Sequence, residues 1–412
     1  MHCTITDKSE TQRASWATFI EEPFRIFFPL GAVCSFLGIF FWVLREFDWA
    51  FQEVSTKVHV WIQIYGFMMS FITGFLCTAI PRFTRTAHIS GHEVLLLFGL
   101  ISVSVVSVLR EAYHVAHGCF LAAIVSLAVI LGVRGVRKKR RMPETFIFIP
   151  FALLCAVSGS LAVNLVIWGS RWKTAELYTL GSNLLFQGFI MFLLLGIGGF
   201  LIRSILGWAP ALPSSADEQP KVPARSSRGW FHILCAVGIL LSFPLEVFFN
   251  NELGLGLRAS LVTLEAVVQM KVHRRPVGGK LTAYWLLAAV WLMIIGLWGA
   301  ALCPIQYRLS FMHLCFGGGF TLSVFSIATR VIFNHGGYGH LLHGNYLPFT
   351  ITVVLLSVGL GTRVVAPFIP EMYTRHLAYA GLTWCLGLLV WCSTILPKVL
   401  MCKAKSSQVS PD

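Results

Sequence analysis

The sequence is short of charge. Only 12% of its 412 residues are charged, whereas 56% are hydrophobic and the mean hydropathy is +0.74. A chain of this composition has too few polar side chains to cover itself with a water-exposed surface, which excludes an ordinary soluble globular protein. The composition predicts an integral membrane protein whose partner is the lipid bilayer.

Acidic residues are scarcer than basic ones. Eighteen Asp and Glu stand against 32 Lys and Arg, which gives a formal charge of +14. The basic residues lie in short loops between apolar runs rather than on one polar face, so we expect no nucleic-acid partner. Basic loops of this kind instead favour the cytoplasmic side of a membrane.

Several patterns of functional sites are also missing. The eleven cysteines include no Cys-x-x-Cys pair and most lie inside apolar runs, which argues against a disulfide framework or a zinc ribbon. No hydrolase triad, phosphate-binding loop or carboxylate pair is recognisable. The first 22 residues carry six charged side chains and do not resemble a removable signal peptide. We therefore expect no unaided hydrolytic enzyme.

What the chain has in abundance is apolar runs long enough to cross a bilayer. We expect an all-α polytopic bundle of about twelve transmembrane helices. The runs are 24–44, 58–81, 92–109, 113–133, 145–169, 178–203, 230–249, 253–272, 281–303, 310–334, 346–369 and 376–400. The third and fourth are separated only by Arg110 and Glu111, where a tight hairpin is expected.

The loops predict a topology and a division of the chain. With the N-terminus inside, most loop Lys and Arg fall on the cytoplasmic side, which predicts that both termini are cytoplasmic. Residues 1–23 and 401–412 are predicted to be cytoplasmic tails. The segment 209–229 holds four prolines among polar residues. It is predicted to be a flexible cytoplasmic linker between a first six-helix half, 24–208, and a second, 230–400.

Histidines are the main candidates for binding. In this topology His59 and His313 lie near the outer face, at the start of helices that run in the same direction, and glycines follow each within a few residues. Imidazole is the usual nitrogen ligand of haem iron and of copper, and glycine lets a flat ligand approach. We expect this pair to bind haem or copper; interfacial histidines without a ligand are the alternative.

Other histidines are further candidates for metal binding. His114 and His117 are three residues apart, so they share a helix face and could chelate copper or zinc. His335 follows His313 by 22 positions, which places it near the opposite membrane face. The glycine- and histidine-rich stretch that it begins could collect a metal; solvated histidines in a turn are the alternative.

Charged residues inside apolar runs are costly in a bilayer unless they find a partner. Arg258 and Glu265 lie seven residues apart in the eighth run, and Glu246 ends the seventh. One interpretation is an ion pair between Glu246 and Arg258. The alternatives are that Arg258 binds a haem propionate and that Glu265 belongs to a proton path.

Three places in the chain are similar to motifs of a known family. They are Phe24-Arg25-Ile26-Phe27-Phe28; His59, Trp61 and Gly66 leading to Gly74-Phe75-Leu76-Cys77-Thr78-Ala79-Ile80-Pro81; and His313, Gly318, Thr329-Arg330 and Asn334-His335-Gly336-Gly337. In these places, which are spread over essentially the whole chain, the sequence resembles the NnrS family. The resemblance implies a twelve-helix bacterial inner-membrane protein that carries haem and copper and is linked to nitric oxide and nitrosative stress.

The departures from the family pattern are as specific as the matches. Trp61 stands where the family has a second histidine, and Leu286 or Leu287 replaces a histidine expected early in the ninth helix. The resemblance implies His59, His313 and His335 as cofactor ligands, with one cofactor kept and another lost.

We therefore expect a haem-binding, possibly copper-binding, membrane protein of the nitric oxide or nitrosative-stress response, with its metal site near the outer face. The second hypothesis is a transporter or chaperone-like partner for a small ligand, without redox chemistry. A scaffold without a cofactor is the third. Whether the protein is an enzyme stays open.

Overall fold

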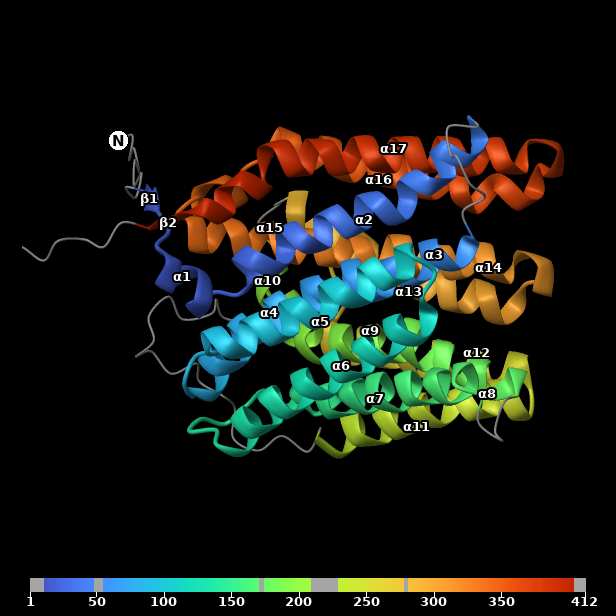
Figure 1. Ribbon diagram of the computed structural model, residues 1–412, viewed down its shortest axis with the longest axis horizontal. Helices are drawn as coiled ribbons and strands as arrows, with labels where there is room; N and C mark the ends of the chain where they lie inside the picture. The colour runs from blue at the N-terminus through green and yellow to red at the C-terminus, as the bar shows by residue number, and fades with distance from the viewer. Residues whose placement is uncertain (1–10, 48–54, 170–173, 209–228, 278–280, 404–412) are drawn as a thin grey trace, which may run out of the picture.

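The chain folds into a bundle of long helices with a two-stranded sheet at one end (Figure 1). The computed structural model describes residues 11–47, 55–169, 174–208, 229–277 and 281–403. Within these ranges twelve helices are long and apolar enough to span a membrane. This confirms the expected fold class and helix count.

Nine spans are built on one main α-helix each. These helices are α2 (Phe24–Glu46), α5 (Gly91–Leu109), α6 (Tyr113–Val136), α7 (Phe148–Ile167) preceded by η2 (Glu144–Ile147), α11 (Gly229–Phe248), α12 (Asn251–Glu265) continued by η5 (Ala266–Met270), α13 (Leu281–Leu302), α16 (Leu347–Val365) with η8 (Ala366–Phe368), and α17 (Tyr373–Thr394) between η9 (Pro370–Met372) and η10 (Leu396–Leu400). The short α1 (Trp16–Glu21) and η7 (Gly339–Leu342) lie outside the spans.

The other three spans are composite helices interrupted by π-helical turns, and they are the most buried of the twelve. They are α3 (Thr56–Trp61), η1 (Ile62–Met68) and α4 (Met69–Thr84); α8 (Ala175–Asn183), η3 (Leu184–Phe189), α9 (Ile190–Leu193), η4 (Leu194–Gly198) and α10 (Gly199–Ile205); and α14 (Ile305–His313), η6 (Leu314–Thr321) and α15 (Leu322–Gly336). Because π-turns often occur at functional sites, these spans are where a site is expected.

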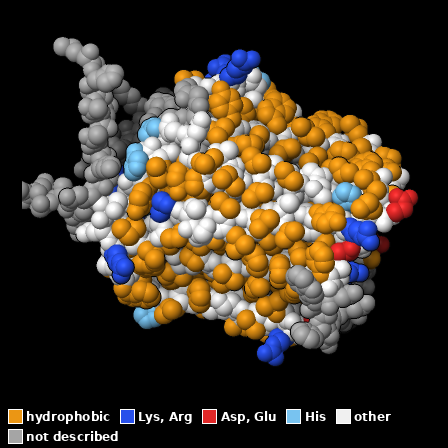
Figure 2. Space-filling view, turned by 90° about the horizontal axis from the view of Figure 1, so that it is seen from above, with side chains coloured by type: hydrophobic (Ala, Val, Ile, Leu, Met, Phe, Trp, Pro, Cys, Tyr) orange, Lys and Arg blue, Asp and Glu red, His pale blue; other side chains and the backbone are white. Residues whose placement is uncertain are grey.

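The remaining helices surround these composite spans and face outward with apolar side chains. Neighbours in sequence pack together, as α5 does with α6 and α16 with α17, and α17 also packs on α2, which joins the last span to the first. Large apolar side chains such as Val358 and Leu389 are exposed on α16 and α17. Hydrophobic side chains cover most of the flank seen in Figure 2. Such a flank suits contact with lipid rather than with water.

The hairpin expected between the third and fourth spans is confirmed. α5 ends at Leu109 and α6 begins at Tyr113. Glu111 adopts a left-handed conformation with φ of 55°, and the Ala112 N–H donates to the Ser107 carbonyl over 2.8 Å. The predicted linker 209–229 lies outside the described residues except for Gly229, with which α11 begins, so the division into two halves stays a prediction. The cytoplasmic placement of the termini also stays a prediction.

The two ends of the chain meet, which the sequence did not predict. Strand β1 (Thr11–Arg13) pairs antiparallel with β2 (Met401–Lys403). Arg25, at the start of α2, donates hydrogen bonds to the carbonyls of Val399 and Met401. We call this end of the bundle the terminal end, and the opposite end, where α3, α8 and α14 begin, the histidine end (Figure 1).

Helices α11 and α12 approach each other closely at Gly254. A Cβ on Gly254 would lie 2.4 Å from the backbone N of Glu246 and 2.5 Å from its Cα, whereas a Cβ on Gly256 would meet nothing within 4 Å. Small residues allow such close approach of membrane helices. Gly254 therefore sets the distance between these two helices, and Gly256 does not.

We expect Gly254→Ala to lower the free energy of unfolding by about 1–3 kcal/mol, because the added methyl group must push the Glu246 backbone away. Gly256→Ala is the matched control on the same helix, and it should leave stability unchanged or raise it slightly. Thermal unfolding of both variants in detergent measures the difference. Equal midpoints for the two variants would contradict the close approach.

Candidate functional site

The structure brings His59 and His313 to the same end of the bundle. His59 lies in α3 and His313 ends α14, and both rings are half-buried. The two rings lie within electrostatic range of each other. Each histidine also precedes a π-helical turn, η1 for His59 and η6 for His313. The two candidate ligands thus occupy equivalent places in two composite helices.

Backbone carbonyls fix both rings in the same way. His59 Nδ1 lies 2.7 Å from the Gly38 carbonyl oxygen, and His313 Nδ1 lies 2.8 Å from that of Leu309. A carbonyl oxygen only accepts hydrogen bonds, so Nδ1 carries the proton in each neutral ring and Nε2 carries the free lone pair. An Nδ1–H held by a backbone carbonyl is the usual support of a metal-ligating histidine.

One arginine lies within electrostatic range of the two rings. Arg363 of α16 acts electrostatically on both His59 and His313. Its Nη1 is buried and has no hydrogen-bond partner within the described ranges. Nearby on α17, Trp384 contacts the position where a Cβ on Gly317 would lie, and its buried Nε1 is also unpartnered. Buried donors without acceptors are uncommon in folded proteins, and both of these are available to a ligand with oxygen atoms.

The donor types of these residues are those that a haem uses. The porphyrin supplies four nitrogens of its own, so two imidazole Nε2 atoms would complete the iron ligands, and an arginine would pair with a propionate. Among the residues that the structure describes, no three His, Cys, Asp or Glu side chains are grouped to hold a metal ion. Among the described His, Cys, Asp and Glu residues, a bare copper ion would therefore have at most two ligands in one place.

His114 and His117 differ in their surroundings although they share a helix. His114 is exposed, whereas His117 is 1% exposed and its Nδ1 is hydrogen-bonded to the Tyr65 hydroxyl. The His117 ring also packs edge-on against Trp61, with ring centroids 4.5 Å apart. His117 is thus part of an aromatic cluster at the histidine end.

His335 lies at the terminal end, away from His59 and His313. Its Nδ1 is 2.7 Å from Glu22 Oε1, and Nη1 of Arg82 is 3.0 Å from its Nε2. Glu22 also pairs with Arg25 and Arg82, each over 2.5 Å. Both ring nitrogens of His335 therefore face charged protein groups. We call Glu22, Arg25, Arg82 and His335 the terminal network.

The sequence did not predict the terminal network, because Glu22 and His335 are 313 positions apart in the chain. The available signal was that Arg25 and His335 both lie in the motif-like stretches and that Arg82 directly follows one of them. Burial alone would raise the pKa of Glu22, but the hydrogen bond from His335 and the charges of His335, Arg25 and Arg82 lower it to about 2. The carboxylate is thus held ionised.

We expect Glu22→Gln to lower the free energy of unfolding by about 2 kcal/mol at pH 7, because it removes charge-assisted hydrogen bonds from a buried arginine. The pKa of Glu22 is below its ordinary 4.5, so its contribution is complete above about pH 4.5 and is lost as the pH falls towards 2. The stability gap between wild type and Glu22→Gln should therefore narrow over that range.

Thermal unfolding in detergent over a pH series measures this gap. Glu21→Gln is the matched control, since Glu21 is the exposed neighbouring carboxylate. A gap that stays constant down to pH 3, or an equal gap for Glu21→Gln, would contradict the role given to the terminal network.

The ion pair expected between Arg258 and Glu246 is confirmed. Arg258 is 0% exposed, and its Nη2 is 2.5 Å from Glu246 Oε2. Its Nη1 donates to Gln187 Oε1 and its Nε to Ser242 Oγ, over 2.5 and 3.1 Å. The Phe243 ring lies 3.7 Å from the guanidinium carbon. Each nitrogen of Arg258 that can donate thus has a partner inside the protein. The arginine within electrostatic range of His59 and His313 is Arg363 instead.

Glu265 has a partner that the sequence reasoning did not find. His232 Nδ1 lies 2.8 and 3.1 Å from the two carboxylate oxygens of Glu265. Both residues are 1% exposed, and within the described part of the chain His232 Nε2 has no partner. The available signal was general: a carboxylate inside a membrane run needs a partner on a neighbouring helix, and α11 precedes α12.

Fold and site together define a polytopic α-helical membrane protein with a histidine pair set in two composite helices. The family profile described as NnrS protein matches residues 18–402, nearly the whole chain. The chain therefore belongs to the NnrS family. No curated protein matches it.

Proposed function

We propose that the protein is a haem-binding integral membrane protein that acts in the nitric oxide or nitrosative-stress response, in the inner (cytoplasmic) membrane of a cell. The observation that supports the haem most directly is the pair of imidazoles, His59 and His313, each with Nδ1 on a backbone carbonyl and therefore with the lone pair on Nε2. Copper is the alternative occupant. Membership of the NnrS family supports the link to nitric oxide.

Different residues of the chain would bind different parts of the cofactor. His59 and His313 offer Nε2 lone pairs from two helices, and the carbonyls of Gly38 and Leu309 keep the protons on Nδ1. Arg363 would pair with a propionate through its unpartnered Nη1. A bound haem supplies one-electron redox chemistry and an iron that binds diatomic ligands such as nitric oxide.

Protein purified from a haem-replete host should show a Soret band. We expect His59→Ala and His313→Ala each to remove most of the bound haem, because each deletes one of two protein ligands to the iron. Arg363→Gln should weaken haem retention about tenfold, which is typical of losing a charge-assisted hydrogen bond. His340→Ala, at an exposed histidine of η7, is the matched control and should keep the wild-type spectrum.

Three outcomes would separate the parts of the proposal. Neither a Soret band nor copper by elemental analysis would remove both occupants. Wild-type spectra for His59→Ala and His313→Ala would show that the cofactor is bound by other residues. A Soret band that does not shift when nitric oxide is added to the reduced protein would contradict the link to nitric oxide.

The second candidate is a transporter for a small ligand, and the buried His232–Glu265 pair favours it. A histidine and a carboxylate 2.8 Å apart inside a bundle can hold one proton between them, and intramembrane pairs of this kind mark proton relays in transporters. The free Nε2 of His232 is the atom from which such a proton could pass on.

This candidate predicts a saturable flux of a small anion or metal ion into proteoliposomes that depends on the pH gradient. Glu265→Gln should abolish the dependence on pH, because an amide does not exchange the proton. Glu176→Gln, at an exposed carboxylate in the first turn of α8, is the control. Absence of flux for every anion and metal tested would rule out transport of these ions.

A further inference from the structure

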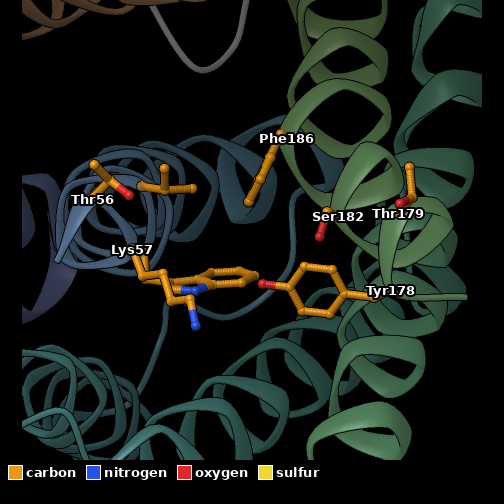
Figure 3. Close-up of a pocket in the computed structure, with 8 residues that line it drawn as sticks. Thr56, Lys57, Tyr178, Thr179, Ser182 and Phe186 are labelled. Carbon is orange, nitrogen blue, oxygen red and sulfur yellow. The ribbon is translucent and has the colours of Figure 1, made fainter. Parts of the chain in front are cut away.

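A cavity of about 250 Å³ opens at the histidine end between α3 and the α8–η3 segment (Figure 3). Thr56, Lys57, Val60 and Trp61 line it from α3, and Tyr178, Thr179, Ser182 and Phe186 line it from the opposite side. Small-molecule sites usually measure roughly 300–1,000 Å³, so this cavity has room for a single substituted ring but not for a porphyrin.

The cavity is separate from the histidine pair. Trp61 follows His59 by two residues in α3, which places the two side chains about 200° apart around the helix axis. His59 is also not among the residues that line the cavity. A ligand in the cavity would occupy one side of α3 while the proposed haem occupies the other.

Aromatic rings form the walls of the cavity. Trp61 is 2% exposed and is held by edge contacts with Tyr178 and Phe186, whose ring centroids lie 6.5 and 5.3 Å from its own. On its other sides Trp61 packs on Tyr65 and His117, at 4.9 and 4.5 Å. Because the tryptophan is fixed from several directions, it forms a rigid part of the cavity wall.

The polar groups of the cavity can donate hydrogen bonds. Figure 3 shows the Tyr178 hydroxyl directed towards α3, with Thr56 and Lys57 on the facing side. Ser182 is 9% exposed, and its buried Oγ makes no well-formed hydrogen bond within the described residues, although the Tyr178 hydroxyl lies near it. No carboxylate is among the lining residues. The cavity thus suits a ligand with oxygen acceptors and does not suit a cation.

We propose that this cavity binds the headgroup of a quinone-class lipid, a flat ring with carbonyl oxygens that reaches the protein through the bilayer. The ring would lie against Trp61 and Phe186, and its oxygens would accept hydrogen bonds from Ser182 and Tyr178. An acyl chain would leave these hydroxyls without partners, and a phospholipid headgroup would have to leave water for a cavity whose accessible surface is mainly apolar. The proposal is independent of the haem.

Equilibrium dialysis of a short-chain benzoquinone against the purified protein in detergent tests the proposal. The measurement can use haem-free protein, because the proposed binding does not depend on haem. We expect saturable binding of one molecule per chain. Ser182→Ala and Tyr178→Phe should each weaken binding about fivefold, because each removes one hydrogen bond while keeping the wall in place. Ser182→Leu should abolish binding by filling the cavity.

Ser260→Ala is the matched control, since Ser260 is exposed on α12, and it should bind as the wild type does. Full competition by an equal concentration of a saturated phosphatidylcholine would show that the cavity takes lipid chains and would overturn the proposal. Binding of the quinone that does not saturate would also overturn the proposal. So would an unchanged affinity for the quinone in both Ser182→Ala and Tyr178→Phe, because these two substitutions hardly change the size of the side chain. A Soret band without quinone binding would leave the haem proposal standing.

Discussion

The structure depends on one constraint: a polar side chain that is buried within a membrane bundle must find its partner inside the protein, because the hydrocarbon around it offers none. Arg258 satisfies this constraint with Glu246 and Ser242 of α11 and with Gln187 of η3. The terminal network satisfies it with charges that close the bundle where the two ends of the chain pair. Both groups are complete within the chain, and both tie helices together.

The same constraint separates structural from functional polar groups. Among the residues that the structure describes, Arg363 Nη1 and Trp384 Nε1 are buried near the histidine pair without acceptors, and His232 Nε2 is buried without a partner. Each unpaired buried atom of this kind costs about 1–3 kcal/mol. The proposed functions assign a ligand or a proton to these three atoms.

The sequence was sufficient for features that depend on one helix at a time. Hydropathy predicted all twelve spans, because each needs only its own apolar run. It also predicted the hairpin at Arg110 and Glu111, and the placement of His59 and His313 at one end follows from the even number of spans between them. Contacts between distant helices were beyond reach: Arg363 beside the histidines, His232 on Glu265 and the pairing of β1 with β2 depend on packing. The π-turns left no periodic signal either, since they interrupt the 3.6-residue repeat by a single residue.

The replacement at position 61 has a structural explanation. The family pattern places two histidines on α3 two residues apart, which directs them to opposite sides of the helix. This chain keeps His59, on the side of Arg363, and has Trp61 on the other, where the indole packs with Tyr65, His117 and Phe186. One side of α3 therefore keeps the donor set of a metal ligand while the other has become an aromatic wall. Because the helix backbone separates the two sides, the second could change without disturbing the first.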